Sequence, residues 1–265
     1  MVRTTVLIKG PGVEKPGSRA AQLENRNRQL EQRIAWQEGE IGRLAELKRF
    51  VAPQVADILL SGAGFERLQV HQSEIVVLFC DLRGFTAFAE AVSPDELMTT
   101  LREYHGVLGP LVREFEGTLN HFAGDGVMVF FNDPTPCINP PLRAVSLAAA
   151  IKRDLSALAK RWRKRGYDLG FGIGLAQGVA TIGQIGFEHR SDYAAIGTVT
   201  NIAARLCAKA KDGQVLVTRD VAAAVWPRAD ARSIGRTRLK GMSKSIAVFE
   251  LGSIAPKEGA TDGEA

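Results

Sequence analysis

The stretch Glu74-Ile-Val-Val-Leu-Phe-Cys-Asp-Leu-Arg-Gly-Phe-Thr86 joins an apolar run to a polar turn, and it decides the fold. Residues 75–80, which follow Glu74, are apolar and rich in β-branched side chains, which is typical of a strand buried on both faces of a sheet. Asp81 follows this run, and Gly84 allows the backbone to turn tightly after it. The stretch therefore predicts a buried strand whose end presents a carboxylate.

Strand and helix patterns alternate after this stretch. Ser93-Pro94-Asp95-Glu96 combines a capping residue, a first-turn proline and a glutamate at the third helical position, so it predicts a helix start. The other expected elements, in chain order, are strands at 117–123 and 127–131, a helix around 147–162, strands near 169–177 and 179–185, a helix over 199–211, and strands at 215–218 and 246–251. The order predicts an α+β fold: a ferredoxin-like βαββαβ core with a C-terminal extension.

A heptad pattern precedes this core. Leucines and a valine repeat at every seventh position from Leu23 to Val51, with Gln37 as the exception, and the intervening a positions include Asn27, Ile34 and Ile41. Ile at a, Leu at d and one Asn at a favour a parallel two-stranded coiled coil; a single amphipathic helix packed on its own domain is the alternative. The expected domains are a leader at 1–18, a coiled-coil helix at 19–62, a catalytic domain at 68–252 and a tail at 253–265.

Composition limits the classes of function. The chain is 45% hydrophobic and 24% charged, as in ordinary globular proteins, and it shows no run long enough for a membrane span. Three cysteines without metal-ligand spacing predict reduced thiols and a cytoplasmic location. The formal net charge of +5 comes from one segment, Lys152–Arg165, which holds seven basic residues and one aspartate. A nucleic-acid-binding protein is therefore not expected.

Two carboxylates stand at predicted strand ends. Asp81 follows the first strand, and Asp125 lies in the Gly124-Asp125-Gly126 turn between two others. If these strands are neighbours, both carboxylates lie at one edge of the sheet and offer oxygen ligands to hard divalent cations. Taken singly, each aspartate is more often a turn or capping residue.

Three separated motifs carry a family resemblance: Asp81-Leu-Arg-Gly-Phe-Thr86, Gly124-Asp125-Gly126 and Ile196-Gly-Thr-Val-Thr-Asn-Ile-Ala-Ala-Arg205. In this order and spacing they resemble the class III nucleotidyl cyclases, the adenylyl and guanylyl cyclase catalytic domain. The resemblance covers about Glu74 to Leu251. It implies a head-to-tail homodimer of the catalytic domain that acts on a nucleoside triphosphate at sites in the interface. The heptad pattern predicts that the N-terminal coiled coil also joins the two chains.

The resemblance also implies roles for individual residues. Asp81 and Asp125, with the Leu82 carbonyl, would bind two Mg²⁺ or Mn²⁺ ions per active site. Asn201 would orient the ribose and Arg205 would stabilise phosphate charge in the transition state, both from the partner subunit. A planar, permanently charged guanidinium suits negative charge that develops on phosphate oxygens. Without the resemblance, an exposed polar helix face is the simpler interpretation of Asn201 and Arg205.

Further residues are expected to contact the substrate. The turn at Gly84, Phe85 and Thr86 would direct backbone N–H groups at the triphosphate. The resemblance implies a phosphate-binding lysine near residue 240, for which Lys240 and Lys244 are both candidates, and Arg190 could assist the pyrophosphate.

The two base-reading positions depart from the family. His121 stands where adenylyl cyclases commonly carry Lys and guanylyl cyclases Glu, and Ala194 stands where Asp or Thr is common. An imidazole can donate to adenine or accept from guanine according to its protonation, so the tautomer decides the preference. The leading hypothesis is an adenylate cyclase that forms cyclic AMP and pyrophosphate. The alternatives are a guanylate or relaxed-specificity cyclase and a catalytically silent cyclase-like dimerisation module.

Overall fold

The computed structural model describes residues 16–48, 50–61, 64–240, 242 and 244–254. The chain divides after Val51 into two compact units, 1–51 and 52–265, and each is described by itself. Most of the predicted leader at 1–18 and most of the predicted tail at 253–265 lie outside the described residues. No helix in the described ranges combines the length and the apolar character that crossing a bilayer requires.

The first unit contains the predicted N-terminal helix. This helix, α1 (Pro16–Lys48), begins three residues before the expected start at 19, with a proline in its first turn where a missing N–H costs nothing. Its heptad side chains are exposed, with Leu23 at 56% and Ile41 at 64%. The helix is confirmed, and the coiled coil stays a prediction.

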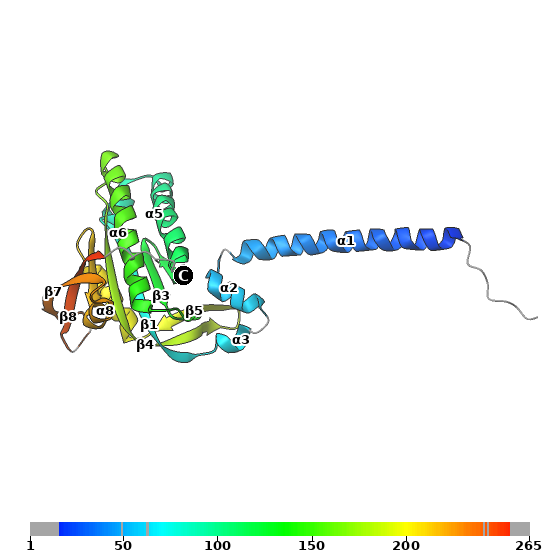
Figure 1. The fold of residues 1–265 in the computed structure, drawn as a ribbon. Coiled ribbons are helices and arrows are strands. Elements are labelled where there is room, and N and C mark those ends of the chain that lie inside the picture. Colours follow the sequence, from blue (N-terminus) through cyan, green and yellow to red (C-terminus); the bar gives the residue numbers. More distant parts are fainter. Residues whose placement is uncertain (1–15, 49, 62–63, 241, 243, 255–265) are drawn as a thin grey trace, which may run out of the picture. The chain divides into compact units, whose positions relative to one another are not determined.

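The core of the second unit has the predicted βαββαβ order (Figure 1). Its elements are β1 (His71–Arg83), α5 (Pro94–Glu114), β2 (Thr118–Ala123), β3 (Gly126–Phe131), α6 (Pro140–Lys164) and β4 (Gly170–Phe187). The strands lie in the order β2-β3-β1-β4, and each neighbouring pair is antiparallel. This is the ferredoxin-like arrangement.

The C-terminal extension continues the same sheet. Its elements are β5 (Arg190–Ile196), α7 (Thr198–Lys209), β6 (Gln214–Thr218), α8 (Arg219–Val225), β7 (Ala229–Thr237) and β8 (Ile246–Ile254). Strand β6 pairs parallel to β4, then β8 and β7 follow antiparallel, and β5 pairs with the far end of β4. Shorter helices are α2 (Pro53–Leu60), α3 (Gly64–Arg67) and α4 (Phe85–Ala91).

Three predicted boundaries were wrong. Strand β4 is one element where two strands were expected, because Gly178 keeps its ladder position opposite Ile75. Strands β5 and β7 were not predicted, because their exposed, mostly polar residues give no apolar alternation. Strand β1 continues to Arg83, so Asp81 lies within the strand, opposite Gly172 and two residues before the strand ends, and not after it.

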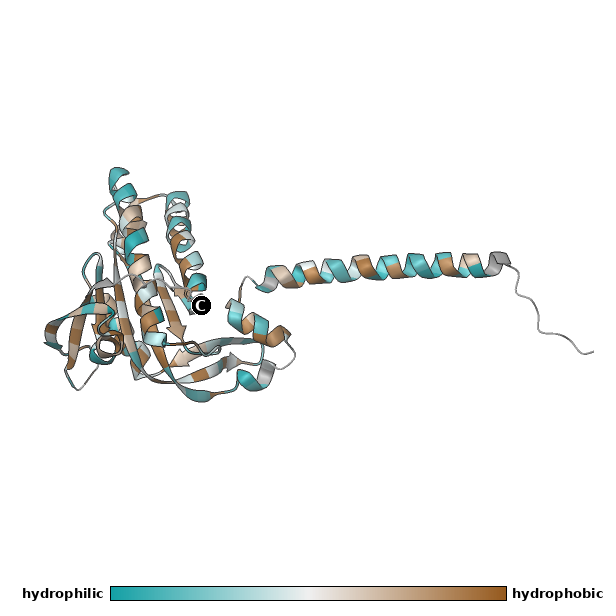
Figure 2. Ribbon diagram, in the orientation of Figure 1, coloured by the Kyte–Doolittle hydropathy of each residue, from teal (hydrophilic) through white to brown (hydrophobic). Residues whose placement is uncertain are grey.

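Both faces of β1 are buried, as the sequence predicts. Val76, Leu78 and Cys80 pack with α5 and α6 in the main core, whereas Ile75 and Val77 pack on the opposite face, against α7. Apolar residues accordingly follow the central strands in Figure 2. The alternation places the odd-numbered residues of β1, Asp81 among them, on the α7 side.

Helix α7 lies unusually close to the sheet at Gly174 of β4. A Cβ atom built at Gly174 would meet the backbone of Cys207 and Ala203 of α7 closer than van der Waals contact allows. At Gly178, four residues further along β4, a Cβ would meet the Val199 side chain of α7 at 3.5 Å, an ordinary van der Waals distance. Gly174 thus permits the close helix–strand approach that fixes α7 against β4.

Candidate active site

Asp81 and Asp125 come together at one end of the sheet, as their positions in the sequence predict. Strand β3 pairs with β1 up to Cys80 opposite Val127, so the β2–β3 turn that holds Asp125 lies beside Asp81. The Leu82 backbone N–H donates to Asp125 Oδ2 at 3.1 Å. Partial burial, followed by hydrogen bonding to Asp81 and its charge, raises the pKa of Asp125 to about 6.

This donor set fits a hard divalent cation. Two carboxylates in contact repel each other when both are ionised, and a bound cation would offset this repulsion. Among the described residues, no group of three or more His, Cys, Asp or Glu side chains is arranged to hold a metal ion by itself. Two carboxylates without a closed protein cage suit Mg²⁺ or Mn²⁺, because Mg²⁺ is usually held by one or two carboxylates and keeps other ligands.

The turn after Asp81 is as tight as the sequence predicts. Gly84 has φ 78°, in the left-handed region, and starts helix α4. Phe85 turns inward and packs on the core, and Thr86 is exposed. The backbone between Leu82 and Thr86 is therefore held in one conformation next to the carboxylates.

Arg83 is a residue of this site that sequence reasoning missed. Its Nη1 lies 3.4 Å from Asp81 Oδ2, and its Nε donates to the Ala210 carbonyl at 2.9 Å. Nη2 donates to the Cys207 carbonyl. The signal available in the sequence was its position two residues after Asp81, which places both side chains on one face of the strand.

Asn201 and Arg205 lie on the exposed side of α7, four residues apart. Within the described part of the chain, no hydrogen bond or ion pair joins either side chain to Asp81 or Asp125. The chain therefore presents two groups of predicted site residues, the carboxylates at the end of β1 and the polar face of α7.

His121 on β2 is part of a short hydrogen-bonded chain. The Ala195 backbone N–H of β5 donates to Asn120 Oδ1 at 3.2 Å, which turns the Asn120 amide nitrogen toward His121. Asn120 Nδ2 lies 2.7 Å from His121 Nδ1. Because an amide nitrogen can only donate, Nδ1 accepts, and the neutral ring carries its proton on Nε2. Ala194 follows on β5, half-buried, directly before Ala195.

Two of the three predicted cationic contacts, Lys240 and Lys244, lie in the loop between β7 and β8, and the third, Arg190, is the first residue of β5. Lys240 and Lys244 are exposed between β7 and β8, and the buried Leu239 beside them packs with Leu206 of α7. Arg190 is exposed at the start of β5, at the end of the β4–β5 hairpin. The structure thus places the lysine loop against α7 and Arg190 on a separate element.

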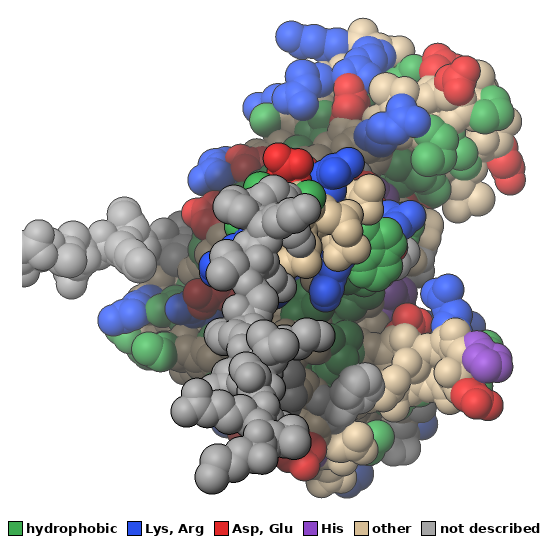
Figure 3. Space-filling view, turned by 90° about the vertical axis from the view of Figure 1, so that its right-hand side faces the viewer, with side chains coloured by type: hydrophobic (Ala, Val, Ile, Leu, Met, Phe, Trp, Pro, Cys, Tyr) green, Lys and Arg blue, Asp and Glu red, His purple; other side chains and the backbone are tan. Residues whose placement is uncertain are grey.

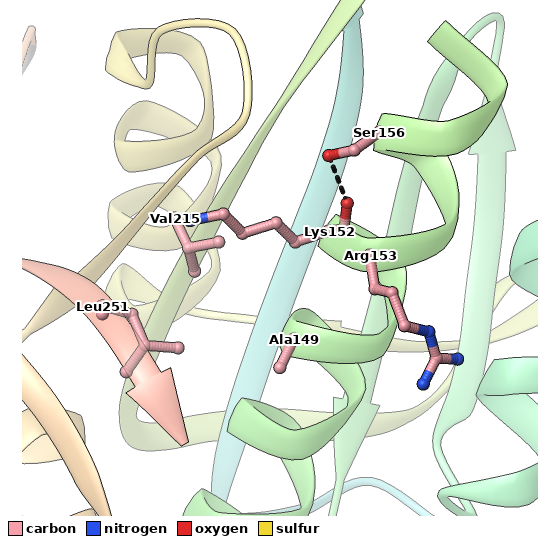
Figure 4. Close-up of a pocket in the computed structure, with 7 residues that line it drawn as sticks. Ala149, Lys152, Arg153, Ser156, Val215 and Leu251 are labelled. Atoms are coloured by element: carbon pink, nitrogen blue, oxygen red, sulfur yellow. Dashed lines mark hydrogen bonds between the residues drawn. The ribbon is translucent and has the colours of Figure 1, made fainter. Parts of the chain in front are cut away.

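The basic segment of α6 forms ion pairs with neighbouring elements. Arg163 pairs with Asp212 at 2.6 Å and Arg165 with Glu103 at 2.7 Å, so part of its charge is matched by carboxylates. A hollow of about 340 Å³ lies between α6 and strands β6 and β8 (Figure 4). Lys152 points across it toward Val215, whereas Arg153 points away. None of its lining residues is a predicted site residue.

Comparison with known proteins gives the family. Residues 68–252 match the adenylate and guanylate cyclase catalytic domain. The chain is 29% identical over 183 residues to adenylate cyclase 1 of Rhizobium meliloti (strain 1021), an alignment that covers 68% of this chain and 28% of that protein. The chain belongs to the adenylate and guanylate cyclase family.

Solved structures agree with this assignment. The adenylyl cyclase CyaB from P. aeruginosa superposes with a TM-score of 0.69 at 28% identity, covering 72% of this chain and all of that one. The guanylyl cyclase Cya2 superposes with a TM-score of 0.68 at 26% identity, covering 72% and 97%. The chain spans less than half the length of the curated adenylate cyclases that it matches.

Proposed function

We propose that this chain forms 3′,5′-cyclic AMP and pyrophosphate from ATP, at sites shared between two subunits. The ribose 3′-oxygen forms a bond to the α-phosphorus, the bond from that phosphorus to the β-phosphate bridging oxygen breaks, and the hydroxyl proton is released. Family membership and the contact between Asp81 and Asp125 support a catalytically competent chain.

Asp81 and Asp125, with the Leu82 carbonyl, would hold two Mg²⁺ or Mn²⁺ ions. When bound, such ions offset phosphate charge and favour ionisation of the attacking hydroxyl. Asn201 holds the ribose in a reactive orientation, and the Arg205 guanidinium stabilises the charge that develops on the phosphate oxygens. Lys240 or Lys244 and Arg190 bind the outer phosphates, next to the backbone of Gly84, Phe85 and Thr86.

The separation of the two groups of residues supports a shared site. In the described part of the chain, Asn201 and Arg205 on α7 make no bond to the carboxylates of their own chain, which supports a head-to-tail dimer in which a second copy supplies them. Exposed apolar side chains suit such an interface: Phe122 at 52%, Val179 at 59%, Phe187 at 70% and Ile196 at 57%. Figure 3 shows hydrophobic side chains among charged ones on one side of the molecule.

Mixing two inactive variants tests the shared site. Asp81→Ala and Arg205→Ala chains are each inactive alone, but a dimer of the two has one site with every residue intact. Random reassociation should restore about one quarter of wild-type activity, because about half of the dimers are mixed and each has one working site. Subunit exchange is verified by mass spectrometry of the intact dimers. No recovery after verified exchange would place the site within one chain.

The observation that carries the preference for ATP is the hydrogen-bonded chain from Ala195 through Asn120 to His121. It leaves His121 Nε2 as a donor in the neutral ring. Adenine N1 accepts a hydrogen bond, whereas guanine carries a proton on N1 and donates, so this tautomer favours adenine. Ala194 adds no polar group, so discrimination against guanine is incomplete.

Base choice is tested by kcat/KM for ATP and GTP, with products identified by mass spectrometry. His121→Glu replaces the donor by an acceptor and should lower the ATP:GTP ratio of kcat/KM by at least tenfold, a difference of about 1.4 kcal/mol. Asn120→Ala frees the tautomer and should lower the same ratio less, without loss of total turnover. An unchanged ratio in both variants would show that His121 does not read the base. A guanylate cyclase would prefer GTP in the wild type, and a silent module would turn over neither nucleotide.

A further inference from the structure

Arg83 connects two elements that the proposed function assigns to different active sites. Its guanidinium lies between the end of β1, which carries Asp81, and the end of α7, which carries Arg205. Nη1 faces three oxygens of β1: Asp81 Oδ2 and the Asp81 carbonyl, each at 3.4 Å, and the Leu82 carbonyl at 3.3 Å.

The other two nitrogens of Arg83 bind the C-terminus of α7. Nε donates to the Ala210 carbonyl at 2.9 Å, and Nη2 donates to the Cys207 carbonyl. The Cys207 carbonyl also accepts from the Ala210 backbone N–H at 3.0 Å. Carbonyls at the end of a helix carry partial negative charge, so a cation there caps the helix and complements its dipole. The side chain is 24% exposed, which strengthens both contacts relative to a surface pair.

A glycine in the neighbouring strand leaves space for the Arg83 side chain. Gly172 of β4 lies opposite Asp81, and a Cβ at Gly172 would collide with the Arg83 guanidinium and lie 3.0 Å from the Ala210 side chain. The missing side chain at Gly172 therefore opens the path from β1 to α7. On the other side of this space, the Cys207 thiol of α7 donates to the Gly172 carbonyl at 3.2 Å and so joins α7 to β4.

We propose that Arg83 is a positioning residue that ties the carboxylate end of β1 to the C-terminus of α7, and so couples the two active sites of the dimer. The proposal rests on the proposed function, since Asp81 serves one site and Arg205 of the same chain serves the other. A fork with three directed donors sets this distance and orientation, and a point charge cannot.

The positioning role of Arg83 and its positive charge predict opposite effects on metal affinity when Arg83 is substituted. A positive charge beside Asp81 repels a metal ion, so removing it would tighten metal binding. Losing the hydrogen bonds from Arg83 to α7 would leave Asp81 and the Leu82 carbonyl less ordered, which would weaken metal binding. Mutation of residues that orient metal ligands typically lowers metal affinity about tenfold or more. The shorter bonds of Arg83 go to α7 and the longer ones to Asp81, so the positional effect is the larger.

The first test measures binding without turnover. Mn²⁺ is titrated onto the full-length protein with 3′-deoxy-ATP, which lacks the attacking hydroxyl, and free Mn²⁺ is followed by electron paramagnetic resonance. Arg83→Lys and Arg83→Met should both weaken Mn²⁺ binding about tenfold. Arg232→Met, which removes an exposed arginine paired with Glu250, is the matched control and should not. Unchanged or tighter binding in the Lys variant would overturn the positioning role.

Hydrogen exchange followed by mass spectrometry reports on the other end of the tie. Peptides that cover the last turn of α7 should exchange faster in both Arg83 variants, whereas the last turn of α6 should not change. Far-UV circular dichroism and thermal unfolding show whether each variant is folded. Arg83→Lys keeps charge and most of the volume, so it remains informative if Arg83→Met does not fold.

Mixed dimers then test the coupling. In the mixture of Asp81→Ala and Arg205→Ala chains, Arg83→Lys is added either to the Arg205→Ala chain, beside the working Asp81, or to the Asp81→Ala chain, beside the working Arg205. The first arm should raise the Mn²⁺ concentration for half-maximal activity about tenfold. The second arm should lower kcat severalfold with no change in that concentration.

In both arms, each mixed dimer contains one chain with the Arg83→Lys substitution, so a general folding defect caused by Arg83→Lys would lower the activity of both arms equally. Equal losses in both arms without a shifted Mn²⁺ requirement, or a second arm identical to the parent mixture, would overturn the coupling. If the parent mixture itself regains no activity, the shared site of the proposed function fails. The Mn²⁺ titration and the hydrogen exchange still decide the role of Arg83 in that case.

Discussion

Asp125 has two separable roles, one in charge and one in structure. Its Oδ2 accepts from the Leu82 N–H at 3.1 Å, which holds the turn, and its charge faces Asp81. Asp125→Asn keeps an acceptor for Leu82 but removes the charge, whereas Asp125→Ala removes both. Both variants should lower kcat at least 100-fold at saturating Mn²⁺, because no other carboxylate compensates.

Thermal unfolding without metal separates the two variants. Asp125→Ala leaves the partly buried Leu82 N–H without its acceptor, so it should be less stable than Asp125→Asn by about 1 kcal/mol. Retention of half the wild-type activity by either variant would rule out the metal assignment of Asp125.

Where short motifs surround a residue of the candidate site, the sequence alone predicts its place in the fold. Asp81, Gly84 and Asp125 were found because each stands next to a strand end or a glycine turn, and these are local signals. Arg83 and Asn120 were missed because their roles depend on partners 127 and 75 residues away. Contacts of this kind become visible only once the sheet order is known.

Among the elements, helix α7 depends on Gly174 for its position. Gly174→Ala would force the helix backbone away from β4, since its Cβ would meet backbone atoms that cannot rotate aside. Overpacking of this kind costs about 1–3 kcal/mol, which is a fall of several degrees in Tm for a domain of this size.

Gly178→Ala is the matched control on the same strand, because its Cβ meets Val199 at 3.5 Å and should leave Tm within about 1 °C. Gly174→Ala should also lower kcat more than it raises KM for ATP, because Arg205 moves with α7. Equal Tm values for the two variants would show that α7 does not need the close approach.

Strand β5 is held to the start of β1 by a buried aspartate. Asp133 is 6% exposed; its carboxylate accepts from Tyr193 on β5 and lies 2.8 Å from His71 Nε2 on β1. His71 Nδ1 lies 2.8 Å from the Gln69 carbonyl, so both ring nitrogens face acceptors and the imidazolium form is favoured. The hydrogen bond to Gln69, then that to Asp133, raises the pKa of His71. Arg67, which donates to the Pro134 carbonyl, is the other charged group nearby.

This pair predicts a pH dependence of stability. A histidine whose pKa is raised on folding stabilises the native state fully below its unfolded pKa, near 6.5, and the contribution is lost as pH rises through the folded pKa. The fall in Tm between pH 6 and pH 8.5 should therefore be about 1–3 °C larger in wild type than in His71→Gln, because the ring is 40% exposed and partly screened. Identical falls would show that His71 gains no proton affinity on folding.

Elements with a buried face could be predicted, and those without one could not. Helices α5 and α6 each bury an apolar stripe in the main core, so their 3.6-residue period is strong. Strand β5 reads Arg-Ser-Asp-Tyr-Ala-Ala-Ile and is mostly exposed, so its strand conformation comes from pairing with β4 and not from its own pattern. Its exposure fits a surface that the proposed dimer covers.

At the scale of the whole molecule, the boundary between the units decides where the helical unit can be removed. Helix α2 belongs with the second unit: Val55 and Ile58 pack with Leu68 and Tyr193, and Gln54 donates to the Gly117 carbonyl at 2.8 Å. Removing α2 would expose these side chains. A loss of activity in a chain that begins at Gly64 could therefore come from lost packing as well as from lost dimerisation. A chain that begins at Ala52 keeps the second unit intact.

The shortened chain tests whether α1 brings two catalytic units together. The exposed heptad residues of α1 should pair with those of a second copy and raise the effective concentration of the attached units. The chain from Ala52 should therefore lose specific activity at nanomolar concentration and recover part of it at tens of micromolar, whereas the full chain should change little. Sedimentation velocity over the same range should show the shortened chain passing from monomer to dimer as activity returns. Ile34→Asp with Ile41→Asp in the full chain is the matched variant, because it keeps the helix but places charge in the predicted seam. It should behave like the shortened chain; full activity of this variant at nanomolar concentration would show that the heptad face does not hold the dimer.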